Sequence, residues 1–146
     1  SERWAALIEL LTSHGFSVLL SGSKADRAAN NAFMTTLPEA TKDKVSLLLG
    51  DWVTFAGTAA QAAAVISVNT GSMHVASLLN VPTIALHGPT SPLRWGPVGR
   101  RSIALVPDGA TSFLNLGFEM LKSDNAYCYR LELTQVTEAL CQMGIL

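Results

Sequence analysis

The stretch from residue 65 to 92 constrains the fold more than any other part of the chain. Two apolar runs, 65–68 and 81–86, have the length of buried strands, and a helix-length segment separates them. Glycine and small hydroxyl residues follow each run, in 69–72 and 87–92. Parallel strands deliver such loops to a ligand crevice at their carboxyl ends. The pattern therefore predicts a parallel α/β sheet with a binding site at one edge.

The first of these loops has the composition of an anion site. Thr70 and Ser72 can cap the following helix, and Gly71 lets the backbone approach a ligand closely. The free N–H groups at the start of that helix would then point at a phosphate. A plain helix cap is the alternative interpretation of this loop, and an ordinary turn is the alternative for Gly88-Pro89-Thr90.

The rest of the chain also alternates between helix and strand. We expect helices from the first residues to about 14, from 24 to about 37, and over 54–63, 71–79 and 134–143, and strands over 16–20, 45–49, 65–68, 81–86 and 103–106. Pro38 should end the second helix, Thr134 should cap the last and Gly144 should end it. Residues 93–99 are expected to form a loop, and 108–125 have no clear pattern. This alternation predicts a Rossmann-like sheet with helices on both faces.

The chain begins with a helix, whereas a doubly wound domain begins with a strand. We therefore expect one domain, 1–146, cut from a longer protein and lacking its first strand. In the strand order 3-2-1-4-5-6 that strand lies between 16–20 and 65–68. Unpaired buried backbone groups would cost about 1–3 kcal/mol each. Tag residues or a neighbouring chain should fill the gap, or these two strands should pair directly.

Composition excludes several classes of protein. The 146 residues are 49% hydrophobic and 14% charged, which is enough for a buried core. A net charge of -1 gives no bulk attraction to nucleic acid, so no nucleic-acid partner is expected. Cys128 and Cys141 lack metal-ligand spacing and fit a reducing cytosol. No run reaches membrane-spanning length and no signal peptide is visible, which favours a cytoplasmic protein, and peripheral association with the inner membrane stays open.

The two loops also carry a family pattern. It consists of a strand, Asp-Thr/Ser-Gly-x-x-His, a helix, a second strand and Gly-Pro/x-Thr/Ser-x-Pro. Residues 88–92 match the second loop in full, and Thr70, Gly71 and His74 keep their spacing in the first. Together with Arg3-Trp4 and Ser21-Gly22, these residues resemble the C-terminal half of the ADP-heptose:lipopolysaccharide heptosyltransferases, glycosyltransferase family nine. The likeness covers nearly the whole chain, including Tyr127-Cys128 and the 133–136 run.

The resemblance implies half of a two-domain GT-B enzyme. This half would hold an ADP-heptose-like nucleotide-sugar donor, while the N-terminal half would bind a lipid-linked saccharide acceptor and carry the carboxylate base. No catalytic residue is therefore expected in this chain. By matching position, the residues that would contact the donor are Asn69, Thr70, Gly71, Ser72, His74 and Thr90, with Asp26 approaching the ribose hydroxyls.

The implied chemistry is inversion at the anomeric carbon, in lipopolysaccharide core biosynthesis. The base deprotonates the acceptor hydroxyl while this half stabilises the leaving diphosphate. The leaving diphosphate can be stabilised by backbone amides, a helix dipole and a histidine, without a metal or cofactor. The sequence also has no pair of carboxylates spaced to bind a divalent ion. We therefore expect no metal site.

Two positions depart from the family pattern. Asn69 stands where the family has Asp, which keeps hydrogen bonding but removes a charge near the sugar. Glu2-Arg3-Trp4 stands where the family tends to place a Lys before its Trp. Either Arg3 replaces that cation or the contact is lost, and both departures bear on donor preference.

Other candidates have a simple structural interpretation. His74 alone would be a core histidine, but within its motif we favour a ligand contact. Trp95 is expected to cover the sheet edge rather than stack on adenine. Solvated charges or packing are the favoured interpretations of Arg94, Arg100, Arg101, His14, His87, Trp52 and both cysteines.

Two other functions fit the same residues. One is a stand-alone nucleotide-sensing or protein-interaction domain that has lost transfer activity, which Asn69 and Glu2 favour. The other is a different two-domain nucleotide-sugar enzyme, such as an epimerase. Gene context would separate the first from a transferase, and donor profiling would separate the second. Formation of a homo-oligomer also stays open.

Overall fold

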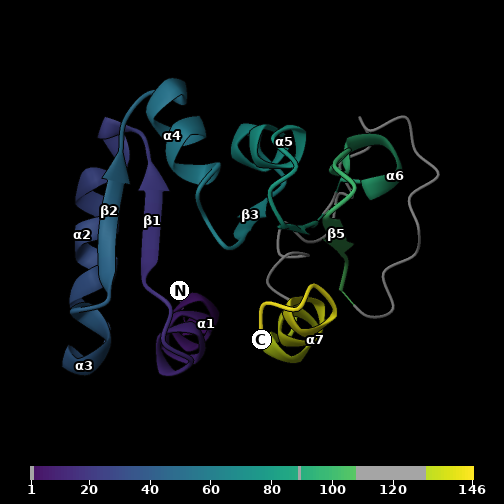
Figure 1. Cartoon of the computed structure of the whole chain (residues 1–146). Helices are drawn as coiled ribbons and strands as arrows, with labels where there is room; N and C mark the ends of the chain where they lie inside the picture. Colours follow the sequence, from purple (N-terminus) through teal and green to yellow (C-terminus); the bar gives the residue numbers. More distant parts are fainter. Residues whose placement is uncertain (1, 89, 108–130) are drawn as a thin grey trace, which may run out of the picture. The chain divides into compact units, whose positions relative to one another are not determined.

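The computed structural model of this chain describes residues 2–88, 90–107 and 131–146. It forms two compact units, Ser1–Gly57 and Thr58–Leu146, each with its own parallel sheet (Figure 1). The expected α/β class with parallel strands is confirmed. The strand order within each sheet also agrees with the doubly wound order, with β2 next to β1 in one sheet and β3-β4-β5 in the other.

The first unit is built on a two-stranded sheet. Strands β1 (Val18–Gly22) and β2 (Val45–Leu49) run parallel, with Val18 opposite Val45. The accompanying helices are α1 (Glu2–Ser13), the 3-10 turn η1 (Lys24–Asp26), α2 (Arg27–Thr35) and the short α3 (Glu39–Lys42). Helix α4 (Trp52–Ala59) follows β2. Helix α1 contacts β1 and α3, and α2 contacts β2.

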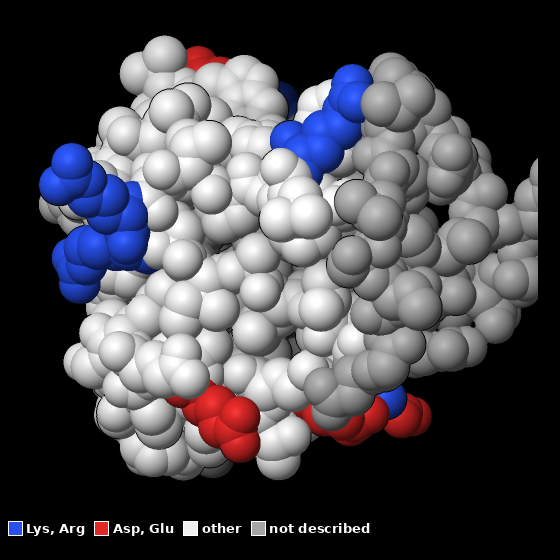
Figure 2. Space-filling model, turned by 90° about the vertical axis from the view of Figure 1, so that its right-hand side faces the viewer, with Lys and Arg blue, Asp and Glu red and all other residues white. Residues whose placement is uncertain are grey.

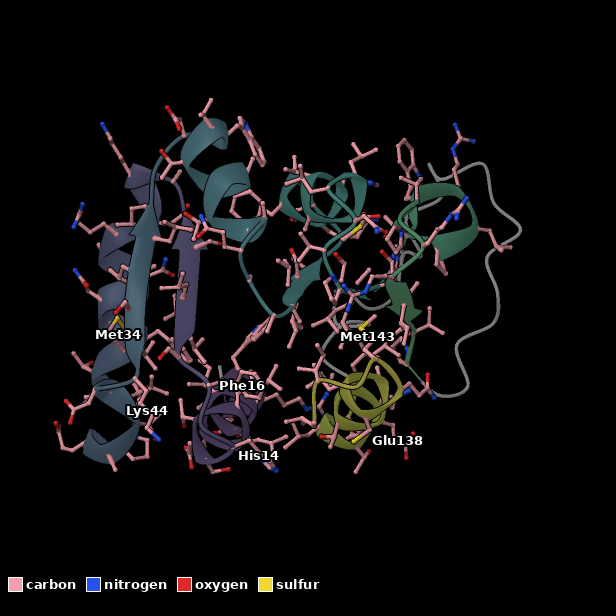
Figure 3. The ribbon with its side chains drawn as sticks, viewed as in Figure 1. His14, Phe16, Met34, Lys44, Glu138 and Met143 are labelled. Carbon is pink, nitrogen blue, oxygen red and sulfur yellow. The ribbon has the colours of Figure 1, made fainter. Side chains whose placement is uncertain are left out.

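Apolar side chains from helices and strands form the core of the first unit. Ile8, Leu37 and Val45 are buried, and Phe33 and Met34 pack against them. The Lys44 ammonium donates to the Thr12 carbonyl at 2.8 Å. This bond connects the residue before β2 with α1; Lys44 and Met34 are labelled in Figure 3. Burial of this apolar cluster holds β1 and β2 together with α1 and α2.

The second unit contains the stretch on which the sequence prediction rests. Its strands are β3 (Val65–Val68), β4 (Thr83–Leu86) and β5 (Ser102–Leu105), with α5 (Gly71–Leu78), α6 (Pro92–Trp95) and α7 (Leu133–Gln142). Helix α5 packs on β3 and β4, and α7 packs on β4 and β5, on opposite sides of the sheet (Figure 1). All four residues of the central strand β4 are therefore buried. This is the two-faced packing that parallel sheets require.

Some expected boundaries are wrong. Strand β1 begins at Val18 rather than at residue 16, and Ser21 and Gly22 belong to the strand rather than to a loop. The first sheet hydrogen bond runs from the Val18 N–H to the Lys44 carbonyl at 2.8 Å. Helix α4 begins at Trp52 because Asp51 Oδ1 accepts the Thr54 N–H at 2.9 Å, and it ends at Ala59 rather than at 63.

The last helix is capped by a different residue from the one expected. Glu132, and not Thr134, occupies the N-cap position of α7. Its N–H donates to Gln135 Oε1 at 3.0 Å, which is one half of a capping box. Gly144, with φ +67°, follows the helix as expected. The short helices α3 and α6 were not expected; α6 begins with Pro92, a residue suited to the first helical position.

The strands on either side of the expected gap each pair within their own unit. Strand β1 pairs with β2, and β3 pairs with β4. How the gap left by the missing strand is closed stays a prediction. Filling of the gap by another segment, and a single domain over 1–146, stay predictions.

Several expectations concern residues outside the described ranges. These are Pro89, the segment 108–125 and Tyr127-Cys128. Within the described ranges, no helix has both the length and the apolar composition that crossing a bilayer requires.

Candidate functional site

The two predicted loops leave the same edge of the sheet. Strands β3 and β4 are parallel neighbours with Val68 opposite Leu86. The Asn69 N–H continues the ladder by donating to the Leu86 carbonyl at 3.1 Å. Both chains then turn away from the carboxyl ends of their strands, which is where open α/β sheets bind ligands.

A side-chain hydrogen bond joins these loops. Asn69 Nδ2 donates to Thr90 Oγ1 at 2.7 Å, across 21 residues of sequence. Both side chains are partly buried. The structure thus brings together two residues that the sequence placed in one crevice.

The start of α5 is not capped in the expected way. Thr70 occupies the N-cap position with an extended backbone, but its side chain makes no capping hydrogen bond. Its hydroxyl instead donates to the Val68 carbonyl at 3.2 Å. Ser72 lies inside the helix, so it cannot cap it either. The Met73 and His74 N–H groups donate to the Thr70 carbonyl, so the N–H groups of α5 that could meet an anion are those of Gly71 and Ser72.

His74 lies on the first turn of α5 and is partly buried. Its backbone N–H donates to the Thr70 carbonyl at 3.3 Å, as part of the helix. Its charge contributes to lowering the pKa of His87, which belongs to the loop after β4. Two imidazoles therefore accompany the two loops, although the sequence singled out only the first of them.

His87 is completely buried. Its Nδ1 lies 3.2 Å from the Thr90 carbonyl oxygen, and its Nε2 has no hydrogen-bond partner among the described residues. Burial lowers the pKa of this imidazole, the Thr90 carbonyl opposes that shift, and His74 adds to it. Packing was the expected role of His87, and its burial agrees with that expectation. Only the tertiary structure shows that its ring contacts the loop that contains Thr90.

We expect His87 to make the domain sensitive to acid. Its folded pKa is lowered from 6.5, so the unfolded chain takes up the proton first as the pH falls. This contribution to stability is complete above about pH 6.5 and is lost as the pH drops below it, by at most about 1.4 kcal/mol per pH unit. Urea unfolding at pH 7.5 and 5.5 measures the loss. His87→Phe should reduce the loss, and an undiminished loss in this variant would contradict the assignment.

Asp26 belongs to the first unit, whereas the other six predicted site residues belong to the second. The Ser23 N–H and hydroxyl donate to its Oδ2 at 2.8 and 2.7 Å, and these two bonds lower the pKa of its carboxyl. Asp26 therefore stays ionised and fixes the turn that follows β1. Its approach to the ribose stays a prediction.

Other candidates take ordinary roles. The Arg94 guanidinium lies 5.4 Å from the Trp95 ring centroid, in a cation–π arrangement on α6. Trp52, expected to be packed, is 58% exposed and meets Phe55 edge to face.

Among the described residues, no group of three or more His, Cys, Asp or Glu side chains could hold a metal ion. On the face drawn in Figure 2, charged side chains are few and form small groups with uncharged surface between them.

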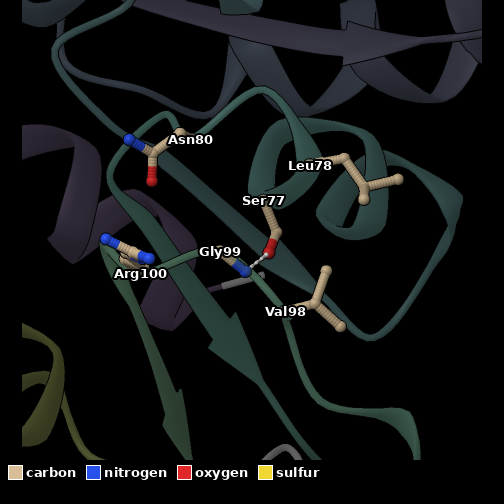
Figure 4. A pocket seen from close by; sticks show the side chains of 6 residues that line it. All are labelled: Ser77, Leu78, Asn80, Val98, Gly99 and Arg100. Atoms are coloured by element: carbon tan, nitrogen blue, oxygen red, sulfur yellow. Dashed lines mark hydrogen bonds between the residues drawn. The ribbon is translucent and has the colours of Figure 1, made fainter.

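A pocket of about 390 Å³ lies at the other end of α5 (Figure 4). It is lined by Ser77, Leu78, Asn80, Val98, Gly99 and Arg100. The Gly99 N–H donates to Ser77 Oγ at 2.6 Å and holds the loop before β5 against the helix. The predicted site residues do not line this pocket.

The fold and these loops define a class of protein. A parallel α/β sheet presents an uncapped helix N-terminus and two linked loops at the carboxyl ends of its strands, which is the arrangement used to bind anionic ligands such as nucleotides. Residues 1–112 match the sequence profile of glycosyltransferase family 9 (heptosyltransferase). The chain belongs to this family.

Curated relatives agree with the match. The lipooligosaccharide heptosyltransferase 2 of Haemophilus influenzae is 32% identical over 109 residues, which cover 70% of this chain and 32% of that protein. The lipopolysaccharide heptosyltransferase 2 of Escherichia coli K12 is 33% identical over 109 residues, covering 70% and 31%. The chain thus spans about a third of the length of these relatives.

Solved structures share the fold. E. coli ADP-heptose lps heptosyltransferase II superposes with a TM-score of 0.73 and 24% identity, over 97% of this chain and 41% of that one. E. coli heptosyltransferase WaaC with ADP gives a TM-score of 0.74 and 22% identity, over 97% and 38%. A family 9 glycosyl transferase from Veillonella parvula gives 0.78 and 21%, over 97% and 40%.

Proposed function

We propose that this chain is the donor-binding half of an inverting heptosyltransferase of lipopolysaccharide core biosynthesis. The observation that carries the proposal is the 2.7 Å bond between Asn69 and Thr90, which joins two loops beside the uncapped start of α5. The heptosyltransferase names of the relatives and the presence of ADP in the WaaC structure support an ADP-sugar as the donor.

In this proposal the diphosphate lies over Thr70, Gly71 and Ser72. The free N–H groups and the positive end of the α5 dipole stabilise its charge as it leaves the sugar. His74 and the Thr90 hydroxyl donate further hydrogen bonds to the donor, and Asn69 lies beside the sugar. The acceptor is a lipid-linked saccharide, bound by another part of the full-length protein that also supplies the base. The enzyme would act in the cytoplasm, at the periphery of the inner membrane.

Calorimetry with a panel of ligands tests the donor assignment. The panel contains ADP, GDP, UDP, AMP and adenosine. We expect ADP to bind most tightly and adenosine to bind at least about tenfold more weakly, since hydrogen bonds to a charged group contribute about 1.5–3 kcal/mol. Equal affinity for ADP and adenosine, or no binding of ADP, would contradict the proposal.

We further expect this chain to bind a donor without transferring its sugar. The chain spans about a third of its relatives, and none of its residues is assigned as the base that activates the acceptor. The measurement is release of ADP from ADP-heptose in the presence and absence of a lipid-linked acceptor. Acceptor-dependent release by the purified chain would refute this expectation, while binding of ADP would still support the donor site.

A further inference from the structure

Asn69, His87 and Thr90 form a connected set of polar groups between the loops that follow β3 and β4, here called the Thr90 cluster. Asn69 Nδ2 lies 2.7 Å from Thr90 Oγ1. His87 Nδ1 lies 3.2 Å from the Thr90 carbonyl oxygen and 3.5 Å from Thr90 Oγ1. Thr90 is therefore contacted by the buried His87 imidazole of its own loop and by the Asn69 amide of the other loop.

The chemistry of these contacts fixes where each proton lies. A carbonyl oxygen can only accept, so His87 Nδ1 carries the proton and donates it to Thr90. Nδ1 is then unable to accept from the Thr90 hydroxyl. Thr90 Oγ1 already accepts from the Asn69 amide. The hydroxyl proton of Thr90 thus has no acceptor within the cluster, and Oγ1 is left as a donor.

We infer that His87 is a positioning residue, which together with Asn69 presents the Thr90 hydroxyl as a hydrogen-bond donor to an anionic oxygen of the ligand. The inference rests on the proposed function and deepens it, because it assigns the recognition of a nucleoside diphosphate to the orientation of one hydroxyl. An anionic oxygen suits this position because it only accepts. None of the three linked side chains is a carboxylate that would repel it.

Asn69→Asp tests the direction of the hydrogen bond. A carboxylate has no N–H, so it would accept the Thr90 proton and withdraw it from the ligand. We expect the affinity for ADP to fall at least about tenfold and the affinity for adenosine to stay unchanged. Asn80→Asp adds the same charge at an exposed position outside the cluster and is the matched control.

The same substitution in a Thr90→Val background separates hydrogen bonding from charge. Valine keeps the shape of threonine and removes the hydroxyl. If Asn69→Asp acts through Thr90, its effect on ADP affinity should be much smaller in this background. An equal effect with and without the hydroxyl would overturn the inference.

His87→Phe tests positioning. The substitution keeps an aromatic ring in a buried site, removes the donor to Thr90 and also removes the unpartnered Nε2. At pH 7.5 we expect an unfolding midpoint close to that of the unsubstituted chain and an affinity for ADP lower by about five- to tenfold. His87→Asn retains an N–H near the Nδ1 position and should restore much of the affinity. His14→Phe is the control at an exposed histidine.

The outcomes separate the two hypotheses. If the unsubstituted chain does not bind ADP, the proposed function fails. If it binds ADP and His87→Phe binds ADP equally well, the inference fails and the proposed function stands. A loss of affinity that His87→Asn does not restore also counts against the inference, because the lost donor would then not be its cause.

Discussion

Gly71→Val is expected to abolish binding of ADP while the fold stays intact. Gly71 is the first residue of α5 and is exposed, so a side chain there does not enter the core. A branched Cβ would instead occupy the space through which a phosphate approaches the free N–H groups. Loss of two hydrogen bonds to a charged group corresponds to a decrease in affinity of at least about 100-fold.

Calorimetry with ADP measures this loss, and circular dichroism confirms the fold. Gly57→Val is the matched control, because among the described residues no atom beyond its chain neighbours and the backbone of its own helix lies within 4 Å of a Cβ built at Gly57. Its affinity for ADP should equal that of the unsubstituted chain. Unchanged affinity for ADP in the Gly71→Val variant would show that the diphosphate does not bind at the start of α5.

Gly99→Ala should destabilise the second unit. A Cβ at this position would lie 2.2 Å from the Ser77 carbonyl oxygen and 3.1 Å from Ser102 Oγ. The backbone must therefore move away from α5, which breaks the 2.6 Å bond from the Gly99 N–H to the buried Ser77 hydroxyl. Overpacking against a backbone atom and loss of a buried hydrogen bond together cost about 2–4 kcal/mol.

Urea unfolding followed by circular dichroism gives the free energy of unfolding. Gly57→Ala makes the same substitution within α4, where the new methyl group meets no described residue outside its own helix. It should stabilise the helix by about 0.5–1 kcal/mol, because alanine loses less backbone entropy than glycine. A Gly99 variant as stable as the unsubstituted chain would mean that this loop is not held against α5.

The Asn69–Thr90 pair connects the fold with the proposed site. Each residue follows a buried strand, and the parallel pairing of β3 with β4 brings them to one edge. In the proposed site this bond would fix the separation of the two loops before a ligand binds, so less entropy would be lost on binding. The asparagine at position 69 thereby has a definite role, as a donor to Thr90.

The sequence by itself determined the features that depend on local pattern. Apolar runs of strand length located β2, β3 and β4 within about two residues, and Gly144 marked the end of α7. Glycine and hydroxyl residues after two successive parallel strands also indicated which loops meet. These signals are readable because periodicity and turn chemistry act over a few residues.

Tertiary structure alone decided the features that depend on distant partners. The start of β1 is set by pairing with the Lys44 carbonyl, and the Thr70 hydroxyl bonds to Val68 instead of capping α5. Likewise, His87 became part of the candidate site only when its buried ring met the Thr90 carbonyl. A hydroxyl or an imidazole can hydrogen-bond to any of several nearby groups, and tertiary packing decides which bond forms. The role of such a side chain therefore follows from the fold rather than from its position in the sequence.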